Sequence, residues 1–392
     1  MNQNSDNLIQ QPFSACWYLG FSLAGSLGVY FGNIYTVPFG NTLLTPDSRY
    51  LVHRGVNGGV SVSLNYCSHG GFPLASETGL LLNDKKRPIK SLVCPMHHWV
   101  FAPDGKNRAS PNCYSDHRKD LQEVSVAEWN GLFLGFNPND LSKSSLRKFA
   151  SSFGIDYQTF DLTNYSHIHA LKDDEVKYPL ILFLINFRDL LHVGVIHPKT
   201  FAEVADCSKP EWEISDHNEE ISHCIQLVRR KKSLKQLKTC DENKHGWLKL
   251  LHFLDENLPL DFEYPIDKDI FALWVDICGA NGLMLEIYCG GLFQVVSHVY
   301  NKDPLNKPTG NANQVEFFIH KSVPYSMRER LSDLLQIAYW QSANEDSGFC
   351  ERFYENHRRF SGHLISNKFA STTHEAGEKP YYDWIRKFMR RV

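Results

Sequence analysis

Two short motifs in this chain have the residue types and spacing needed to hold a metal cluster. They are Cys67-Ser68-His69 and Cys94-Pro95-Met96-His97. Two thiolates and two imidazoles in this order match the ligands of a Rieske-type [2Fe–2S] centre, in which two Cys bind one iron and two His bind the other. Such a centre has a higher reduction potential than one held by four thiolates. The motifs therefore predict a one-electron carrier, and the electrons need a destination.

A second segment, residues 186–198, could supply that destination because it contains a carboxylate and two histidines, His192 and His197. Two His and one carboxylate form a facial triad that leaves positions on Fe(II) open for O₂. On a regular helix, residues five apart point roughly 140° apart, so the two His converge only if the helix ends or kinks. Gly194 and Pro198 favour such an end. Alone, this pattern suggests ordinary histidines near a helix end, and the cluster motif reverses that preference.

Composition excludes several classes of protein. The chain has 392 residues, 42% of them hydrophobic and 22% charged, which predicts two or three globular domains. The net charge of −3 provides no general field for binding nucleic acid. Ten Cys at irregular spacing are too few for a disulfide-stapled secreted domain. We therefore expect the Cys outside the cluster motifs to be mostly reduced and buried.

The N-terminal stretch is apolar but does not resemble a targeting signal. It has no charged residue from Asn7 up to Pro46, and only Asp6 precedes this run. A signal peptide would begin with Lys or Arg, and repeated glycines make a membrane-spanning helix unfavourable. We expect entry strands of a β-domain here, no membrane span, and a cytoplasmic location.

Short alternating segments predict an all-β domain up to about residue 136. The expected strands are residues 49–54, 60–64, 89–93, 99–101 and 128–135. Both ligand motifs then lie on loops at strand ends, where functional residues are often found. The polar segment 137–152 is predicted to be a linker.

The remainder, residues 153–392, has the pattern of an α+β domain. Residues 178–197 and the basic segment 222–238 are predicted helices. A long helix is expected over 327–360, with Gly348 as the position where it could break. Four further segments are predicted to be strands of one sheet: 271–276, 283–289, 292–299 and 315–320.

Taken together, these motifs resemble the Rieske non-haem iron oxygenases, at the level of their large (α) subunit, over nearly the whole chain. The catalytic motif of that family, Asn-aromatic-x-acid-x-x-His-x-x-x-x-His-Pro, is matched at Asn186, Phe187, Asp189, His192, His197 and Pro198. The resemblance implies an N-terminal all-β Rieske domain in residues 1–136. It also implies a helix-grip (START/SRPBCC-like) catalytic domain with a central antiparallel sheet in residues 153–392.

The resemblance also assigns roles to residues. It makes His192 and His197 ligands of a mononuclear Fe(II), and Asp189 a bridge that hydrogen-bonds a cluster His of the neighbouring subunit. The family's carboxylate ligand comes late in the chain, and we assign that role to Asp346. Glu345 is the alternative, because an error of one residue is easy to make in a helix. The cluster ligands would be Cys67, His69, Cys94 and His97.

Several features differ from related proteins. Rieske proteins of respiratory complexes carry an extra Cys in each ligand loop, but Met96 occupies that position in the second loop here. The family often has Arg after the first His and Gly after the second, where this chain has Gly70 and His98. His98 therefore competes with His97 for the ligand role. The gap of 24 residues between the motifs is long, and we interpret residues 77–88 as an extended surface hairpin.

The implied activity is hydroxylation of an apolar or aromatic small molecule by O₂. The electrons would come from NADH or NADPH through a separate ferredoxin or flavin reductase, and the family's transfer between subunits implies a homotrimer. The basic run 229–238 is either a docking face for the donor or an ordinary solvated surface. Residues that could line a substrate pocket are Val193, Ile196, Phe201, Phe293 and Val295.

Three other activities fit the same motifs. The first is oxidative demethylation or monooxygenation of a quaternary amine or similar small molecule. The second is a Rieske electron carrier whose second domain holds no iron. The third is a second domain that binds a lipid-like ligand without catalysis, which helix-grip folds also do.

Overall fold

The computed structural model describes most of two compact units. The described residues are 30–111, 118–135, 161–178, 186–190, 192–216, 222–231, 246–278, 282–301 and 311–359. The first unit comprises the described residues from 30 to 135 together with 161–163, and the second comprises those from 164 onward. The predicted entry strands before residue 30 and the predicted linker 137–152 lie outside the described residues. Among the helices described, none combines the length and apolar character required to cross a membrane.

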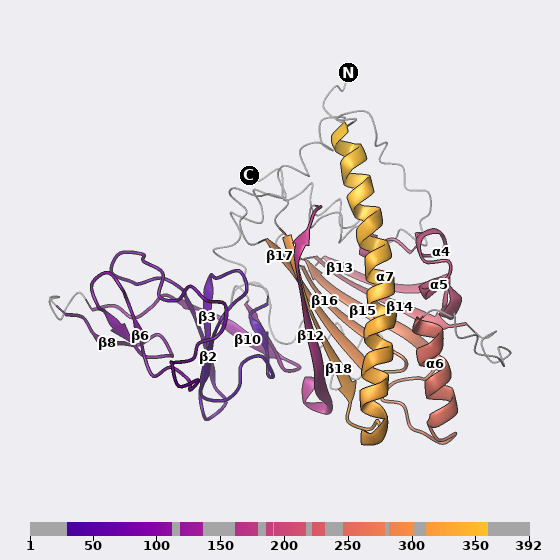
Figure 1. Ribbon diagram of the computed structural model, residues 1–392, viewed down its shortest axis with the longest axis horizontal. Helices are drawn as coiled ribbons and strands as arrows, with labels where there is room; N and C mark the ends of the chain where they lie inside the picture. The colour runs from indigo at the N-terminus through magenta and orange to yellow at the C-terminus, as the bar shows by residue number, and fades with distance from the viewer. Residues whose placement is uncertain are drawn as a thin grey trace. The chain divides into compact units, whose positions relative to one another are not determined.

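The first unit consists of three small antiparallel sheets. It is therefore all-β, as the alternating pattern predicted (Figure 1). The strand orders of the sheets are β5-β2-β3-β4-β9, β1-β11-β10 and β6-β7-β8. Apolar side chains from facing strands, such as Tyr50, Val52 and Phe133, form one of its two hydrophobic clusters among the described residues. The strands are β1 (Gly32–Asn33), β2 (Asn41–Leu44), β3 (Tyr50–Arg54), β4 (Val60–Leu64), β5 (Gly79–Leu80), β6 (Leu92–Val93), β7 (Val100–Phe101), β8 (Asn107–Ala109), β9 (Glu123–Val124), β10 (Val126–Trp129) and β11 (Leu132–Gly135).

The segment 128–135 is not the single strand predicted from its apolar character. It contains the end of β10, a turn, and β11, which pair as a hairpin with Trp129 opposite Leu132. Asn130 and Gly131 form the turn with φ angles of 51° and 79°. Two consecutive positive φ angles match the twist of a tight antiparallel hairpin, and Asn-Gly is its best sequence signal.

The segment between the two ligand loops does form the predicted surface hairpin. Leu82 and Pro88 make an isolated antiparallel bridge, and most residues between them are exposed. Asn83 closes the turn, because its backbone N–H donates to the Arg87 carbonyl at 2.8 Å and its carbonyl accepts from the Lys86 N–H at 2.8 Å.

The second unit is a seven-stranded antiparallel sheet in the order β12-β18-β17-β16-β15-β14-β13, with helices packed on one face (Figure 1). This is the predicted helix-grip arrangement. Its strands are β12 (Tyr165–Val176), β13 (Ala205–Asp216), β14 (Ser222–Arg230), β15 (Ile270–Cys278), β16 (Gly282–Tyr288), β17 (Phe293–Asn301) and β18 (Asn311–His320). Its helices are α4 (Val193–Ile196), α5 (Phe201–Val204), α6 (Gly246–Asn257) and α7 (Tyr325–Arg359), and a 3₁₀ turn, η5 (Leu162–Asn164), precedes β12.

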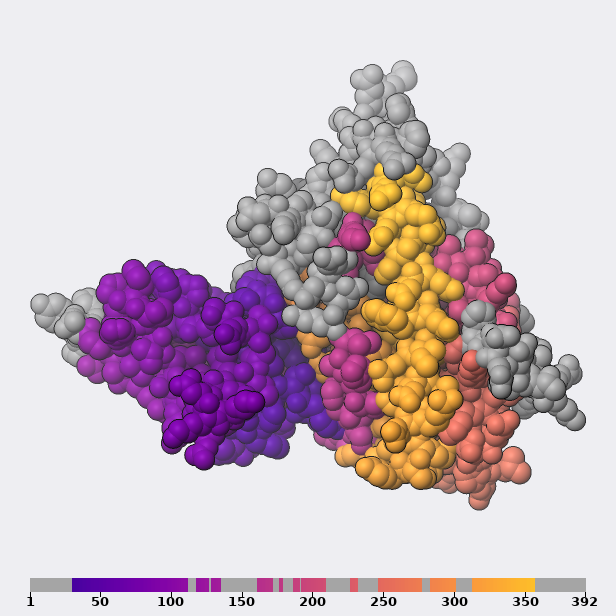
Figure 2. Space-filling view, viewed as in Figure 1, coloured from indigo at the N-terminus to yellow at the C-terminus, as the bar shows by residue number. Residues whose placement is uncertain are grey.

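The helix α7 carries functional residues and packs closely against α6. A Cβ atom on Gly246, the first residue of α6, would lie 2.5 Å from the Cα of Ala338, so only glycine permits this approach. The predicted break near Gly348 is absent, because one glycine costs only about 1 kcal/mol in a helix and the surrounding packing outweighs it. The other side of α7 lies on the protein surface (Figure 2), where Ile337 is 50% exposed.

The strands predicted in the second unit are confirmed as β15–β18, but the predicted basic helix is wrong. Residues 222–230 form β14, hydrogen-bonded between β13 and β15. Its Gln226, Leu227 and Val228 are buried, whereas Arg229 at its end is exposed. Pairing on both edges therefore outweighs the helical preference of a segment rich in charged residues. The rest of the basic run, from Lys232, lies outside the described residues.

Candidate metal centres

The first candidate centre is formed by two loops of the first unit. One loop follows β4 and carries Cys67 and His69, and the other joins β6 to β7 and carries Cys94 and His97. Both Cys are buried and free of disulfide bonds. The rings of His69 and His97 are in contact, with centroids 4.7 Å apart, and both His are exposed. The structure therefore brings all four predicted cluster ligands together.

The two loops share one backbone design. The N–H of Cys67 donates to the Phe72 carbonyl at 2.8 Å, and the N–H of Cys94 donates to the Trp99 carbonyl at 2.8 Å. Each Cys carbonyl also accepts from the N–H four residues later, on Gly71 and His98. Those two residues have φ angles of 74° and 57°. His98 therefore occupies a left-handed loop position, where glycine is usual. The ring that contacts His69 is that of His97.

Two residues that support the loops were not singled out from the sequence. Asn65 is buried, and its side-chain amide bonds the carbonyls of Ser48 and Ala75 while its oxygen accepts from the N–H of Ala75. Trp99 stacks on His69 with ring centroids 4.8 Å apart and an angle of 16°. The sequence offered only two weak signals for these roles: an Asn two residues before the first Cys and a Trp two residues after the second His.

These residues fit a Rieske cluster, judged by the chemistry and position of the donors. Burial raises the pKa of the Cys67 thiol, and the adjacent Cys94 thiol raises it further. Two buried thiols side by side are therefore unfavourable as free thiolates and suited to sharing one metal. The exposed imidazole pair lies where the second iron of such a cluster would reach the surface.

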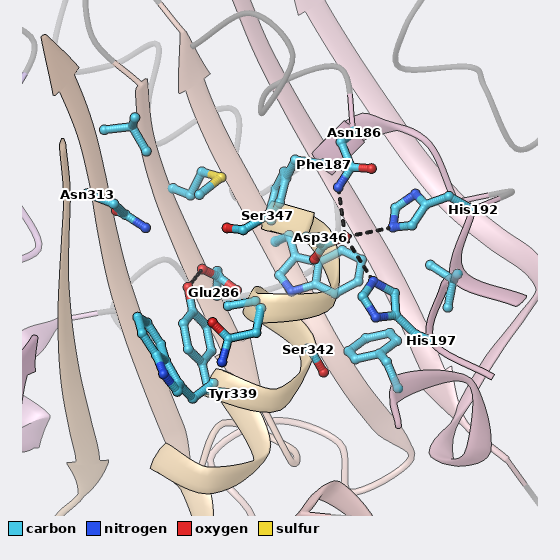
Figure 3. Close-up of a pocket in the computed structure, with 18 of the residues that line it drawn as sticks. Asn186, Phe187, His192, His197, Glu286, Asn313, Tyr339, Ser342, Asp346 and Ser347 are labelled. Atoms are coloured by element: carbon cyan, nitrogen blue, oxygen red, sulfur yellow. Dashed lines mark hydrogen bonds and ion pairs between the residues drawn. The ribbon is translucent and has the colours of Figure 1, made fainter. Parts of the chain in front are cut away.

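The second candidate centre lies in the second unit, where His192, His197 and Asp346 converge. Their nearest donor atoms all lie within 4.8 Å of one another. Asp346 Oδ1 is 2.9 Å from His197 Nε2 and 3.3 Å from His192 Nε2 (Figure 3). The two His converge because α4 spans only the four residues between them and ends at His197, whose φ and ψ of −111° and 36° leave the helix.

Hydrogen bonds and charge hold this trio in place. Asn186 Nδ2 donates to Asp346 Oδ1 at 2.8 Å. Burial lowers the pKa of His192, but the carboxylates of Asp189 and Asp346 outweigh it and raise the pKa to about 9. Burial likewise opposes ionisation of Asp346, yet the two His hold its pKa well below the ordinary value. A bound cation would replace the protons shared by these groups, so the donor set fits a divalent iron with open positions.

Glu345 lies on the outer side of His197, away from the trio. Its Oε2 accepts hydrogen bonds from His197 Nδ1 at 2.6 Å and from Thr200 Oγ1 at 2.6 Å. A carboxylate at Nδ1 fixes the tautomer and leaves the Nε2 lone pair available to a metal. The geometry thus favours Asp346 over Glu345 as the ligand and gives Glu345 a positioning role. Its adjacency to Asp346 in the sequence did not reveal this role.

Asp189 lies beside the other histidine. Its Oδ2 is 3.8 Å from His192 Nδ1, and its side chain is 22% exposed. The preceding residue, Arg188, is fully buried and forms an ion pair with Asp276 on β15. Gln226 of β14 also donates to the Phe187 carbonyl at 3.2 Å. The segment that carries Asn186 and Asp189 is therefore held against the sheet by contacts to β14 and β15.

A cavity opens directly beside the three converging groups, between the sheet and α7 (Figure 3). Val193 and Phe201, two of the predicted pocket residues, line it. The other three are not among its described lining residues. Phe293 and Val295 are fully buried in the core, and Ile196 is half-buried. The strand β17 was expected to contribute because it is apolar, but these two side chains pack in the core. Further lining residues are Tyr178, Trp247, Trp274, Met284, Glu286, Tyr288, Val299, Asn313, Tyr339 and Trp340.

A search of protein families identifies the first unit. Residues 38–126 match the Rieske [2Fe–2S] domain, and this range contains both ligand loops. The fold of the chain as a whole matches solved structures of a quaternary ammonium Rieske monooxygenase and of naphthalene 1,2-dioxygenase. Residues 38–126 therefore belong to the Rieske [2Fe–2S] domain family, and the likeness to the solved structures shows that the chain shares their fold.

Individual relatives are distant. A putrescine 2-hydroxylase from Bordetella bronchiseptica is 24% identical over 357 residues, which cover 89% of this chain and 75% of the relative. A quaternary ammonium Rieske monooxygenase linked to carnitine oxidation by gut microbiota aligns with a TM-score of 0.58 and 15% identity, covering 92% of this chain and 88% of that one. Naphthalene 1,2-dioxygenase from Rhodococcus sp., bound to indole, aligns with a TM-score of 0.63 and 12% identity over 99% of each chain.

Proposed function

We propose that this chain is the oxygenase component of a Rieske system that hydroxylates a small organic molecule bound in the cavity. O₂ is the oxidant, and a separate ferredoxin or flavin reductase supplies electrons from NADH or NADPH. The observation that carries the proposal is the convergence of His192, His197 and Asp346 within 4.8 Å at the wall of a cavity. A donor triad at the wall of a largely apolar cavity suits an iron that must meet both O₂ and substrate.

Each group of residues has a separate task in this proposal. Cys67, His69, Cys94 and His97 would hold the [2Fe–2S] cluster, while His192, His197 and Asp346 would hold Fe(II). When bound, the cluster supplies single electrons and the Fe(II) supplies a site for activating O₂. Glu345 keeps the proton of His197 on Nδ1, and Asn186 fixes one Asp346 oxygen by its hydrogen bond.

Asp189 is proposed to connect the two kinds of site between subunits. Its carboxylate lies near His192 Nδ1 and is partly exposed, so it can accept a hydrogen bond from an imidazole of another chain. His69 and His97 are exposed and can donate one. This role requires a closed assembly, for which a homotrimer is proposed. The use of NADH or NADPH supports a cytoplasmic location as part of the same proposal.

The cavity walls are suited to excluding water from the reacting groups. Phe187, Val193 and Phe201 provide apolar surface next to the histidines. Such a lining supports a substrate with a substantial apolar part. The names of the relatives include amines as well as an aromatic hydrocarbon, so both classes remain candidates for this chain.

Iron content and oxygen uptake together test the proposal. The reconstituted full-length protein should hold about three irons per chain, two in the cluster and one at the triad, whereas a pure electron carrier would hold about two. With a surrogate reductase and NADH, a suitable substrate should increase O₂ consumption and gain oxygen, detected by product mass. Two irons per chain and no substrate-dependent O₂ consumption would instead support the electron carrier or the non-catalytic ligand-binding domain.

A further inference from the structure

The cavity beside the triad contains a second carboxylate that the proposed chemistry does not use. Glu286 lies on β16 with 3% of its surface exposed, and it lines the cavity with its side chain near Tyr339 (Figure 3). Apart from the triad and tyrosines, Glu286 is the one titratable residue among the described lining residues. No Lys or Arg occurs in that described lining.

Two phenols orient this carboxylate. Tyr339 of α7 donates to Glu286 Oε1 at 2.8 Å, and Tyr288 of β16 donates to Oε2. Trp274 Nε1 in turn donates to the Tyr288 hydroxyl at 3.2 Å. A carboxylate oxygen can accept more than one hydrogen bond, so each oxygen keeps acceptor capacity after these contacts. The network fixes the direction of the carboxylate but brings no positive charge to it.

Electrostatics around Glu286 favour an added cation. Burial raises its pKa to about 7, the phenol hydrogen bonds oppose this, and the negative charge of Asp346 adds to it. A buried charge without an opposite partner is unfavourable, and neutral donors compensate only part of that cost. A positively charged ligand group in the cavity would supply the missing partner.

The remaining walls suit the same kind of group. Trp274, Tyr288 and Tyr339 place aromatic side chains around the carboxylate, and Trp340 adds another ring to the cavity lining. Aromatic faces attract ammonium groups through their quadrupoles, most strongly for Trp and in sites shielded from water. A carboxylate among aromatic rings therefore distinguishes a cation from a neutral group of the same shape.

We propose that Glu286 is a specificity-determining residue that selects a substrate carrying an amine or quaternary ammonium group. The cation is held on the sheet side of the cavity, and the part of the substrate to be oxidised extends toward His192, His197 and Asp346. This inference rests on the proposed function, because it takes the cavity to be the substrate site. It favours the amine or quaternary ammonium alternative over the neutral apolar or aromatic substrate, both of which were expected from the sequence.

Binding measurements on the full-length, iron-loaded protein test the inference without turnover. Choline and its carbon isostere 3,3-dimethyl-1-butanol have the same shape, but only choline is charged. In a second pair, n-pentylamine and 1-pentanol have the same carbon chain and differ only in the terminal group, which is a cation in the amine. By isothermal titration calorimetry, the cationic member of a pair should bind at least tenfold more tightly. Glu286→Gln keeps the size and the hydrogen-bonding capacity, and it should reduce this preference to within about threefold.

Glu316→Gln is the matched control, because Glu316 is also a buried carboxylate on this sheet but does not belong to the described cavity lining. It should keep the cation preference. Equal affinity for the two members of both pairs in the wild-type protein would overturn the inference, and so would an unchanged preference in Glu286→Gln. The comparison of the two pairs in the wild-type protein can still refute the inference if the variant fails to fold.

The two proposals fail in different ways. Loss of the cation preference, with three irons per chain and O₂ uptake stimulated by neutral substrates, would refute the role of Glu286 and leave the oxygenase intact. A Glu286-dependent preference in a protein with two irons per chain and no O₂ uptake would refute the oxygenase and leave cation selection intact.

Discussion

Glu345 provides a direct test of how the mononuclear site is held. Replacing it with Ala removes the acceptor that lies 2.6 Å from His197 Nδ1 and 2.6 Å from Thr200 Oγ1. His197 then loses the contact that fixes its ring and its tautomer, while all three donors of the triad remain. Loss of a group that hydrogen-bonds a metal-ligating His typically lowers metal affinity about 10–100-fold. That range equals about 1.4–2.8 kcal/mol, similar to one hydrogen bond to a charged group, about 1.5–3 kcal/mol.

The assay compares the two iron sites within the same molecule. Fe(II) is titrated away with a chelator of known affinity, total iron is measured by mass spectrometry, and cluster absorbance reports the Rieske centre. Glu345→Ala should release the third iron at a 10–100-fold lower chelator concentration, with cluster absorbance unchanged. Glu355→Ala, at an exposed position on the same helix, should behave like the wild type. Wild-type iron retention in Glu345→Ala would refute the positioning role, and parallel loss of the cluster would indicate misfolding instead.

Other variants test the remaining assignments. Asp189→Ala should keep both metal centres and lose about 10–100-fold in reductase-coupled turnover, and near-normal turnover would contradict the bridging role. Asp346→Ala should lose one iron per chain, measured by mass spectrometry, while keeping the cluster absorbance. His98→Gly should keep the cluster spectrum and change the melting temperature little, because relief of left-handed strain and the added flexibility of the unfolded chain, each about 1 kcal/mol, nearly cancel. By contrast, His97→Ala should abolish the cluster spectrum, and the reverse result would make His98 the ligand. Gly246→Ala should lower the melting temperature by several degrees, because its Cβ would lie 2.5 Å from the Ala338 backbone.

The elements that the sequence predicted well are those with strong local patterns. The strands β15–β18 are apolar runs bounded by polar or glycine residues, and α7 is long enough for its pattern to be clear. The segment 222–230 was mispredicted because its charged end hides a strand whose pairing depends on β13 and β15. The hairpin at Asn130-Gly131 was missed although the dipeptide itself is a turn signal.

In the candidate sites, too, local sequence patterns were predictable and long-range contacts were not. Residue type and spacing selected the four candidate cluster residues, whereas the two histidines of the triad became candidates only in combination with the cluster motif and the family resemblance. The roles of Glu345, Asn65 and Glu286 depend on which side chain lies opposite them after folding, with partners as distant as 148 residues for Glu345 and His197. Such long-range contacts leave no periodicity or spacing in one sequence, so only the structure reveals them.

The separation between the triad's members also links metal supply to protein stability. His197 and Asp346 are 149 residues apart in the chain, so an iron held by both, as proposed, would close a very long loop between α4 and α7. Closing a loop of this length restricts the unfolded chain strongly, and a ligand bound only by the folded state adds about 2.7 kcal/mol of stability at 100 times its Kd. Cells short of iron would therefore accumulate a catalytic unit that is less active and also unfolds more readily.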